Sequence, residues 1–129
     1  MISEIRRGQD PHVAAWAHSV RESDLYLSVL TLGEIRKGID RLRNRDQTRA
    51  QLFENWLGQL RARFADRILP IDDRAAERWG TLNATRTRST VDSLIAATAF
   101  VYGLTIATRN TGDFEDCEVR LLDPWQPRP

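Results

Sequence analysis

The chain has 129 residues, of which 41% are hydrophobic and 29% charged, and its formal net charge is +1. A chain of this size can bury a core without metals or disulfides, and its balanced charge does not by itself indicate nucleic-acid binding. The one cysteine, Cys117, excludes an intramolecular disulfide and is typical of a reducing, cytoplasmic setting.

The first third of the sequence predicts helices around one strand. Residues 1–7 can begin a helix, and their charged side chains are not those of a signal peptide. Helical spacing of apolar residues returns from His12. The apolar segment 25–30 predicts a buried strand. Thr31 is expected to cap the next helix, which has an apolar stripe of Leu32, Ile35, Ile39 and Leu42.

The middle of the chain continues this alternation. We expect a helix over residues 47–63 whose apolar face packs in the core, with a partner surface as the alternative; the face consists of Leu52, Phe53, Trp56, Leu57, Leu60 and Phe64. Residues 68–72 predict an edge strand, because their proline cannot donate a ladder hydrogen bond. Asp73 is expected to cap the following helix. Thr90 opens a nearly all-apolar helix that ends at Gly103.

Two further strands are predicted over residues 105–108 and 119–122, with a turn at 110–112 between them. Strands that alternate with helices indicate an α/β fold, a parallel sheet covered by helices on both faces. We therefore expect a single domain over residues 1–129. No apolar run reaches the ~18 residues of a membrane span.

Three acidic residues follow strands or open helices in this arrangement. Glu34 lies one turn into the helix after the first predicted strand, Asp92 lies in the first turn of the apolar helix, and Asp113 follows the strand at 105–108. The ends of parallel strands meet at one edge, so the sheet could bring all three together. Taken singly, each has a plainer interpretation, as an exposed helix residue, a partner of the helix dipole and a turn residue, respectively.

Clustered carboxylates repel one another unless a cation neutralises them. An all-oxygen site favours Mg²⁺ or Mn²⁺, which activates water and stabilises the leaving oxygen when the substrate is a phosphodiester. Arg109 is a candidate phosphate contact or an ion-pair partner. Other chemistry fits poorly, because His12 and His18 lie on different sides of one helix and Cys117 is flanked by acids that raise the pKa of its thiol.

Four blocks of the sequence, taken together, resemble the PIN-domain toxins of the VapC type. They are ISEIRRG, SVLTLGEIRKGI, TVDSLIAATAFVYGLTIATRN and TGDFEDCEVRLLDPW, and they extend along nearly the whole chain. The resemblance implies a PIN-like fold and a metal-dependent endoribonuclease, the toxin of a type II toxin–antitoxin system. It also implies a small VapB-type antitoxin as inhibitor, RNA as substrate and, in many relatives, a homodimer.

The resemblance assigns residues to the site. Glu34 matches the acid of the TLGE segment, Asp92 the acid before LIAATA, and Asp113 the acid of the TRNTGDF segment. These three would hold Mg²⁺ or Mn²⁺. The polar residues that line the site in relatives match Thr31, Thr108 and Asn110.

One element of the family has no counterpart in this sequence. In relatives, a strand that ends in Asp-Thr-Asn precedes the ISEIRRG helix and supplies a principal metal ligand, whereas Met1 stands here at the valine after that Asn. We therefore expect the first strand of the sheet to be missing or truncated and the metal affinity to be lower. Three explanations stay open: a sequence that starts late, a longer gene product whose GTG valine codon was read as a start, and a degenerate protein.

Two other functions compete with a ribonuclease. A catalytically impaired PIN module would bind antitoxin or RNA without cleaving RNA, even when metal is abundant. A phosphoacceptor signalling domain also uses acids on a doubly wound sheet, but it needs a lysine near a late strand. The only lysine, Lys37, lies in the first half of the chain, which argues against that function.

Overall fold

The computed structural model of this chain describes residues 15, 16 and 18–126. The helix predicted over residues 1–7 lies outside them, as does the start of the one predicted from His12. Within the described residues, Trp16 is helical and buried, and it packs in the core beside Leu27.

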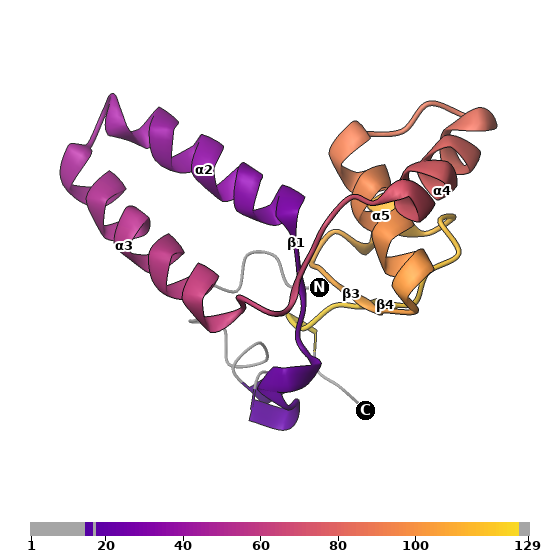
Figure 1. Cartoon of the computed structure of the whole chain (residues 1–129), viewed down its shortest axis with the longest axis horizontal. Helices are drawn as coiled ribbons and strands as arrows, with labels where there is room; N and C mark the ends of the chain where they lie inside the picture. The colour runs from indigo at the N-terminus through magenta and orange to yellow at the C-terminus, as the bar shows by residue number, and fades with distance from the viewer. Residues whose placement is uncertain (1–14, 17, 127–129) are drawn as a thin grey trace.

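Two helix pairs diverge from a centre of short strands (Figure 1). In the first pair α2 (Val29–Arg43) packs against α3 (Gln47–Arg63), and in the second α4 (Asp73–Ala84) packs against α5 (Thr90–Tyr102). Short 3-10 helices, η2 (Glu22–Asp24) and η3 (Thr111–Phe114), precede the first strand and follow the third. The predicted turn after residue 108 is therefore partly helical.

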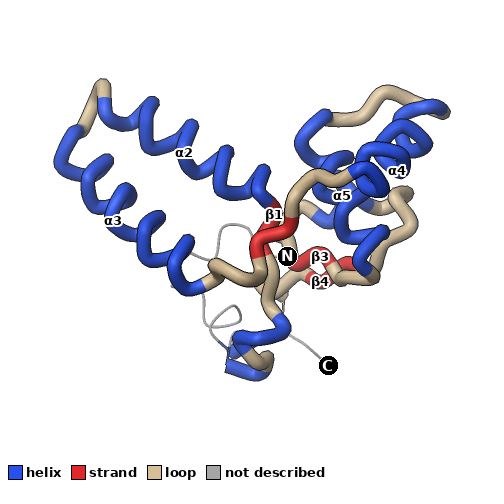
Figure 2. The backbone as a smooth tube through the Cα atoms, viewed as in Figure 1, coloured by secondary structure: helices blue, strands red, loops and turns tan. Residues whose placement is uncertain are grey.

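The strands form two parallel pairs (Figure 2). β1 (Leu27–Ser28) pairs with β2 (Ile68–Leu69), and β3 (Ile106–Ala107) pairs with β4 (Leu121–Leu122). In the described part of the chain the predicted parallel sheet takes the form of two separate pairs, because no strand there hydrogen-bonds to both pairs. The parallel pairing and its alternation with helices are as predicted.

Helix starts differ from the predicted caps by one to three positions. Ser28, rather than Thr31, caps α2, since its Oγ accepts a hydrogen bond from the backbone N–H of Leu30 at 3.1 Å. Asp72, rather than Asp73, caps α4. At the end of α5, Gly103 adopts the left-handed φ of +66° that the sequence predicted. The early start of α2 also shortens β1, because Val29 is already helical.

The hydrophobic residues form one cluster on each helix pair. The first lies between β1 and the α2–α3 pair and includes Leu27, Leu32 and Leu57. The second joins α5 to β3 and η3, with Ala97 and Phe114 among its buried members. Each cluster therefore fixes a helix pair against the strand that leads into a predicted site residue.

The apolar face predicted on α3 is only partly in the core. Leu57 is buried, and Phe53, Trp56 and Leu60 pack against the core. Leu52, in contrast, is 64% exposed. The expectation that this whole face packs internally is wrong for Leu52, and the alternative of a partner surface applies to its exposed part.

No helix among the described residues is both long and apolar enough to cross a membrane.

Candidate functional site

The three predicted acids lie on three different elements. Glu34 is in the second turn of α2, Asp92 in the first turn of α5, and Asp113 in η3. Partial burial raises the pKa of the Asp92 carboxyl above its ordinary value, and the charges of Asp113 and Glu34 raise this pKa further. A hydrogen bond with Ser89 acts in the opposite direction. The fold thus brings the charges of Glu34 and Asp113 within electrostatic reach of Asp92.

Local hydrogen bonds fix the backbone around Asp92. Its N–H donates to the Oγ of Ser89, the residue that caps α5, at 3.4 Å. The next residue, Ser93, is buried, and its hydroxyl donates to the carbonyl of Ser89 at 2.7 Å. Asp92 itself is half-buried, so it is less enclosed than its apolar helix predicted. Its carboxylate can therefore be reached from solvent.

Glu34 is exposed and already has a cationic partner. Its Oε2 lies 3.2 Å from the ammonium nitrogen of Lys37, one turn further along α2. Both side chains remain about half in solvent, and such pairs contribute little to stability. Lys37 therefore neutralises part of the charge that Glu34 directs at Asp92.

Asp113 is exposed and is held by the short helix η3. Its N–H donates to the carbonyl of Asn110 at 3.1 Å, and the next residue, Phe114, is buried in the second hydrophobic cluster. Phe114 anchors η3 to α5, the helix that carries Asp92. The position of one acid relative to the other thus depends on packing between these two elements.

The polar residues expected to line the site differ in exposure. Thr31 and Thr108 are buried, whereas Asn110 is exposed. Thr108 shapes the turn after β3, since its Oγ1 accepts from the N–H of Asn110 at 3.1 Å and its own N–H donates to Leu122 O at 2.9 Å. Its hydroxyl serves the backbone of the segment that leads to Asp113.

Arg109 stacks on an aromatic ring instead of pairing with an acid. Its guanidinium carbon lies 4.7 Å from the ring centre of Trp125, and within the described residues it forms no salt bridge. Trp125 follows β4, and its backbone N–H donates to Asp123 Oδ1 at 2.8 Å. No pattern in the sequence predicts a role for Trp125. Its only signal was its place just after the last predicted strand.

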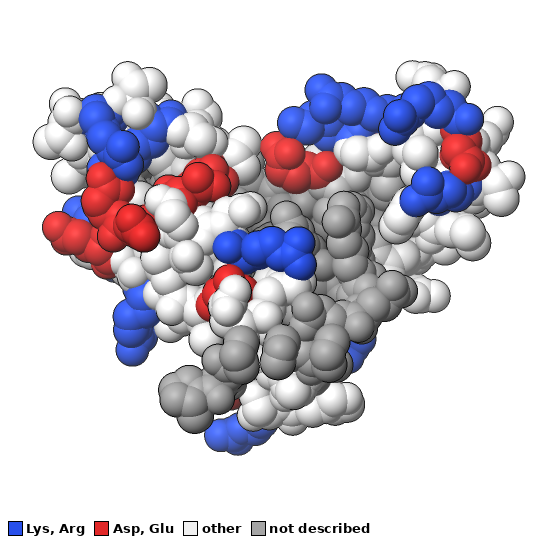
Figure 3. Space-filling view, turned by 180° about the vertical axis from the view of Figure 1, so that it is seen from behind, with Lys and Arg blue, Asp and Glu red and all other residues white. Residues whose placement is uncertain are grey.

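The donors at this site have the chemistry that a hard divalent cation requires. The charges of Asp113 and Glu34 act on the carboxylate of Asp92, and a cation would relieve that repulsion. Among the residues that the structure describes, however, no three side chains of His, Cys, Asp or Glu are gathered closely enough to hold an ion. The donor types therefore fit a divalent cation, whereas their positions leave the carboxylates apart. Figure 3 shows acidic side chains on both sides of the hollow between the α2–α3 pair and the α4–α5 pair.

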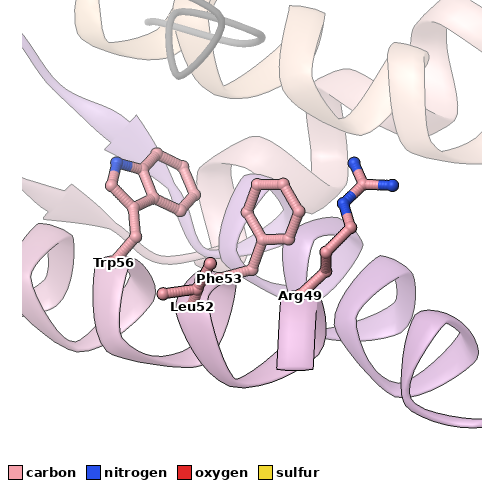
Figure 4. Close-up of a pocket in the computed structure, with 4 residues that line it drawn as sticks. All are labelled: Arg49, Leu52, Phe53 and Trp56. Carbon is pink, nitrogen blue, oxygen red and sulfur yellow. The ribbon is translucent and has the colours of Figure 1, made fainter. Parts of the chain in front are cut away.

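A second surface feature lies on α3, away from these acids. Arg49, Leu52, Phe53 and Trp56 line a shallow groove of about 280 Å³ (Figure 4). The Arg49 guanidinium lies 5.9 Å from the ring centre of Phe53. None of these four lining residues is acidic, so the groove has the character of a binding surface and not of a hydrolytic centre.

Comparisons with known proteins point in one direction. The profile of the PIN domain family matches residues 2–118. Toxin FitB of Neisseria gonorrhoeae is 36% identical over 97% of this chain and 94% of its own length. VapC ribonuclease Y4jK of Sinorhizobium fredii is 34% identical over 98% of this chain and 94% of its own.

Solved structures agree with the sequence matches. FitAB bound to an IR36 DNA fragment superimposes with a TM-score of 0.83 at 31% identity, covering 93% of this chain and 87% of the other. VapBC-1 from nontypeable Haemophilus influenzae has a TM-score of 0.77 at 17% identity, covering 95% and 91% of the two chains. The second match speaks for the fold alone.

Proposed function

The chain belongs to the PIN-domain family, and from this membership we propose that it is an endoribonuclease, the toxin of a toxin–antitoxin pair. Relatives named as toxins or VapC ribonucleases match it over almost its full length. The observation on this chain that carries the proposal is the electrostatic coupling of Glu34 and Asp113 to Asp92. Acids on three separate elements whose charges act on one another destabilise the fold unless a cation offsets their repulsion.

In this proposal Glu34, Asp92 and Asp113 hold a divalent cation, Mg²⁺ or Mn²⁺. When bound, the cation would act as a Lewis acid for the attacking water and for the leaving oxygen of the phosphodiester. The carboxylates orient the attacking water through hydrogen bonds. Thr31, Thr108 and Asn110 line this region, and Thr108 holds the turn that leads to Asp113. Arg109 contacts a phosphate of the RNA, while Trp125 restricts the guanidinium to one side.

A VapB-type antitoxin is the proposed protein partner. The superimposed FitAB structure is named for two components, and this chain resembles toxin FitB. The exposed groove on α3 offers an apolar surface to such a partner, because Leu52 is 64% exposed there. A homodimer, which the resemblance implies, remains part of the proposal.

An RNA cleavage assay with Mn²⁺ or Mg²⁺ tests the proposed activity. Asp92→Asn keeps the size of the side chain and removes its charge, so cleavage should fall by about 100-fold or more. Asp66→Asn is the matched control, because the Asp66 side chain is 87% exposed and its one ion pair among the described residues is with its neighbour Arg67. Thermal melts of both variants show whether the fold persists. Equal RNA cleavage by the unaltered chain and by Asp92→Asn would contradict the assignment of Asp92 to a ribonuclease site.

The same experiment separates the runner-up function. A binding module that has lost its activity would bind the antitoxin and leave RNA intact at every metal concentration. In that case the unaltered chain and Asp92→Asn would be equally inactive. Cleavage by the unaltered chain that a chelator abolishes supports the nuclease.

A further inference from the structure

One arginine ties the loop between α4 and α5 to the segment that follows η3. The side chain of Arg88 is only 10% exposed. Its Nε donates to the carbonyl of Leu82, in the last turn of α4, at 2.8 Å. Its Nη1 donates to Asp116 Oδ1 at 2.6 Å and lies 3.7 Å from the buried sulfur of Cys117. The guanidinium is thus fixed from two directions at once.

The backbone of Arg88 is fixed as well. Its N–H donates to Asn83 Oδ1 at 3.1 Å, while the Asn83 amide donates to the Ser93 hydroxyl at 3.3 Å. Ser93 directly follows Asp92 in the first turn of α5. The hydrogen bonds therefore run from the end of α4 through the loop to the turn that carries Asp92.

The two segments joined by Arg88 are those that carry two of the three acids. Arg88 lies just before α5, and Asp116 lies just after Asp113 on the chain that leaves η3. The ion pair with Arg88 holds the pKa of Asp116 below its ordinary value, so Asp116 stays charged at neutral pH. A charged, hydrogen-bonded pair with a largely buried guanidinium is a stronger restraint than a surface pair.

A neighbouring arginine offers a natural comparison. Arg86 also donates to Asp116 Oδ1, at 2.9 Å, but its side chain is 58% exposed. Within the described residues Arg86 donates no hydrogen bond to α4 or to Cys117. Arg86 therefore shares the charge and the partner of Arg88 without its bridging position.

We propose that Arg88 is a positioning residue that sets the separation of Asp92 and Asp113, and thereby the affinity of the site for a divalent cation. This inference rests on the proposed role of the two acids as cation ligands. The carboxylates of Asp92 and Asp113 repel each other, so they would move apart if the segments that carry them were no longer linked. A cation would then have to draw the carboxylates together at the expense of its own binding free energy. Residues that orient metal ligands typically change metal affinity by about 10- to 100-fold when they are removed.

The test measures Mn²⁺ binding to the full chain without RNA, by isothermal titration calorimetry. Arg88→Met should raise the Kd for Mn²⁺ by about 10-fold. Arg88→Lys keeps the charge but loses the planar guanidinium that reaches Leu82 and Asp116 together. Its Kd for Mn²⁺ should therefore lie between those of the unaltered chain and Arg88→Met. Arg86→Met is the matched control and should leave the Kd within about 2-fold of the unaltered value. Asp116→Asn keeps Arg88 and weakens the same link, so it provides a second route if Arg88→Met does not fold.

A merely structural role predicts a different pattern. Arg88→Met would then lower the melting temperature of the metal-free chain, while its folded fraction kept the Kd of the unaltered chain. RNA cleavage gives an independent readout. Excess Mn²⁺ should restore the cleavage activity of Arg88→Met but not that of Asp92→Asn. An unchanged Kd in folded Arg88→Met or Asp116→Asn overturns the inference while the ribonuclease proposal stands. An unchanged Kd in Asp92→Asn overturns the ligand assignment and this inference with it.

Discussion

The guanidinium of Arg109 lies 4.7 Å from the centre of the Trp125 ring, and the two residues follow the adjacent parallel strands β3 and β4. The same edge of this strand pair leads into η3, which carries Asp113. Stacking on the indole limits the directions that the arginine fork can take, while its N–H donors remain available. Arg109 forms no salt bridge with the part of the chain that the structure describes, so its restricted guanidinium suits a contact with a substrate phosphate.

Removal of Trp125 should therefore weaken RNA binding more than it slows the chemical step. An exposed cation–π pair is worth roughly 0.5–1 kcal/mol, so Trp125→Ala should raise KM by about 2- to 5-fold with a smaller change in kcat. Trp125→Phe keeps a ring and should lie nearer the unaltered chain. Steady-state cleavage of a short RNA checks this. If Arg109→Gln and Trp125→Ala both leave KM unchanged, the phosphate contact is wrong.

Two leucines on α3 should respond very differently to the same truncation. Leu57 is 1% exposed and Leu52 is 64% exposed. Leu57→Ala leaves a cavity in the first hydrophobic cluster and should cost about 2–5 kcal/mol of unfolding free energy. Leu52→Ala removes little buried surface and should stay within about 0.5 kcal/mol. Urea denaturation measures both, and similar losses would contradict the division of this face into core and surface.

The helices could be predicted from the sequence because their signals are local. Apolar spacing located α3 to the residue, and Gly103 marked the end of α5 correctly. The caps were less certain, since Asp72 and Asp73 are chemically alike. Only the backbone conformation decides which of them lies outside the helix. The division of the sheet depends on hydrogen bonds between distant strands, which local patterns do not contain.

Some residues of the candidate site could likewise be predicted from local patterns, and others could not. The approach of Glu34 and Asp113 to Asp92 follows from the rule that functional groups gather where parallel strands end. Arg88 and Trp125 could not be found by that rule. Arg88 reaches a partner 28 positions along the chain, and no spacing in the sequence marks such a contact. A single sequence thus predicts candidate acids and misses an arginine and a tryptophan whose partners lie far along the chain or after the last strand.

The pH dependence of stability should depend on Glu54, which holds α3 to α2. The hydrogen bonds that Glu54 accepts from Arg36, at 2.6 and 2.7 Å, lower the pKa of its carboxyl. The ionised form therefore stabilises the fold above the ordinary glutamate pKa of about 4.3, and this contribution is lost as the pH falls through the lower folded-state pKa. Glu54→Gln should flatten the decline of the melting temperature between neutral and acidic pH.

Glu77→Gln is the control for that experiment. Glu77 is exposed on α4 and forms no salt bridge within the described residues. Its substitution should leave the pH profile of the melting temperature close to that of the unaltered chain. A profile for Glu54→Gln that matches the unaltered chain would show that the Arg36 pair does not contribute.

Lys37 should compete with a divalent cation for Glu34. Its ammonium lies 3.2 Å from Glu34 Oε2, and a cation that uses this carboxylate must displace it. Lys37→Met removes the competitor while Glu34 remains, so the Kd for Mn²⁺ should fall by up to about 5-fold, the range of an exposed ion pair worth 0–1 kcal/mol. Arg41→Met is the control, because it removes one positive charge from the same helix without a contact to Glu34. Calorimetry that finds weaker Mn²⁺ binding in Lys37→Met alone would mean that Lys37 supports Glu34 instead of competing for it.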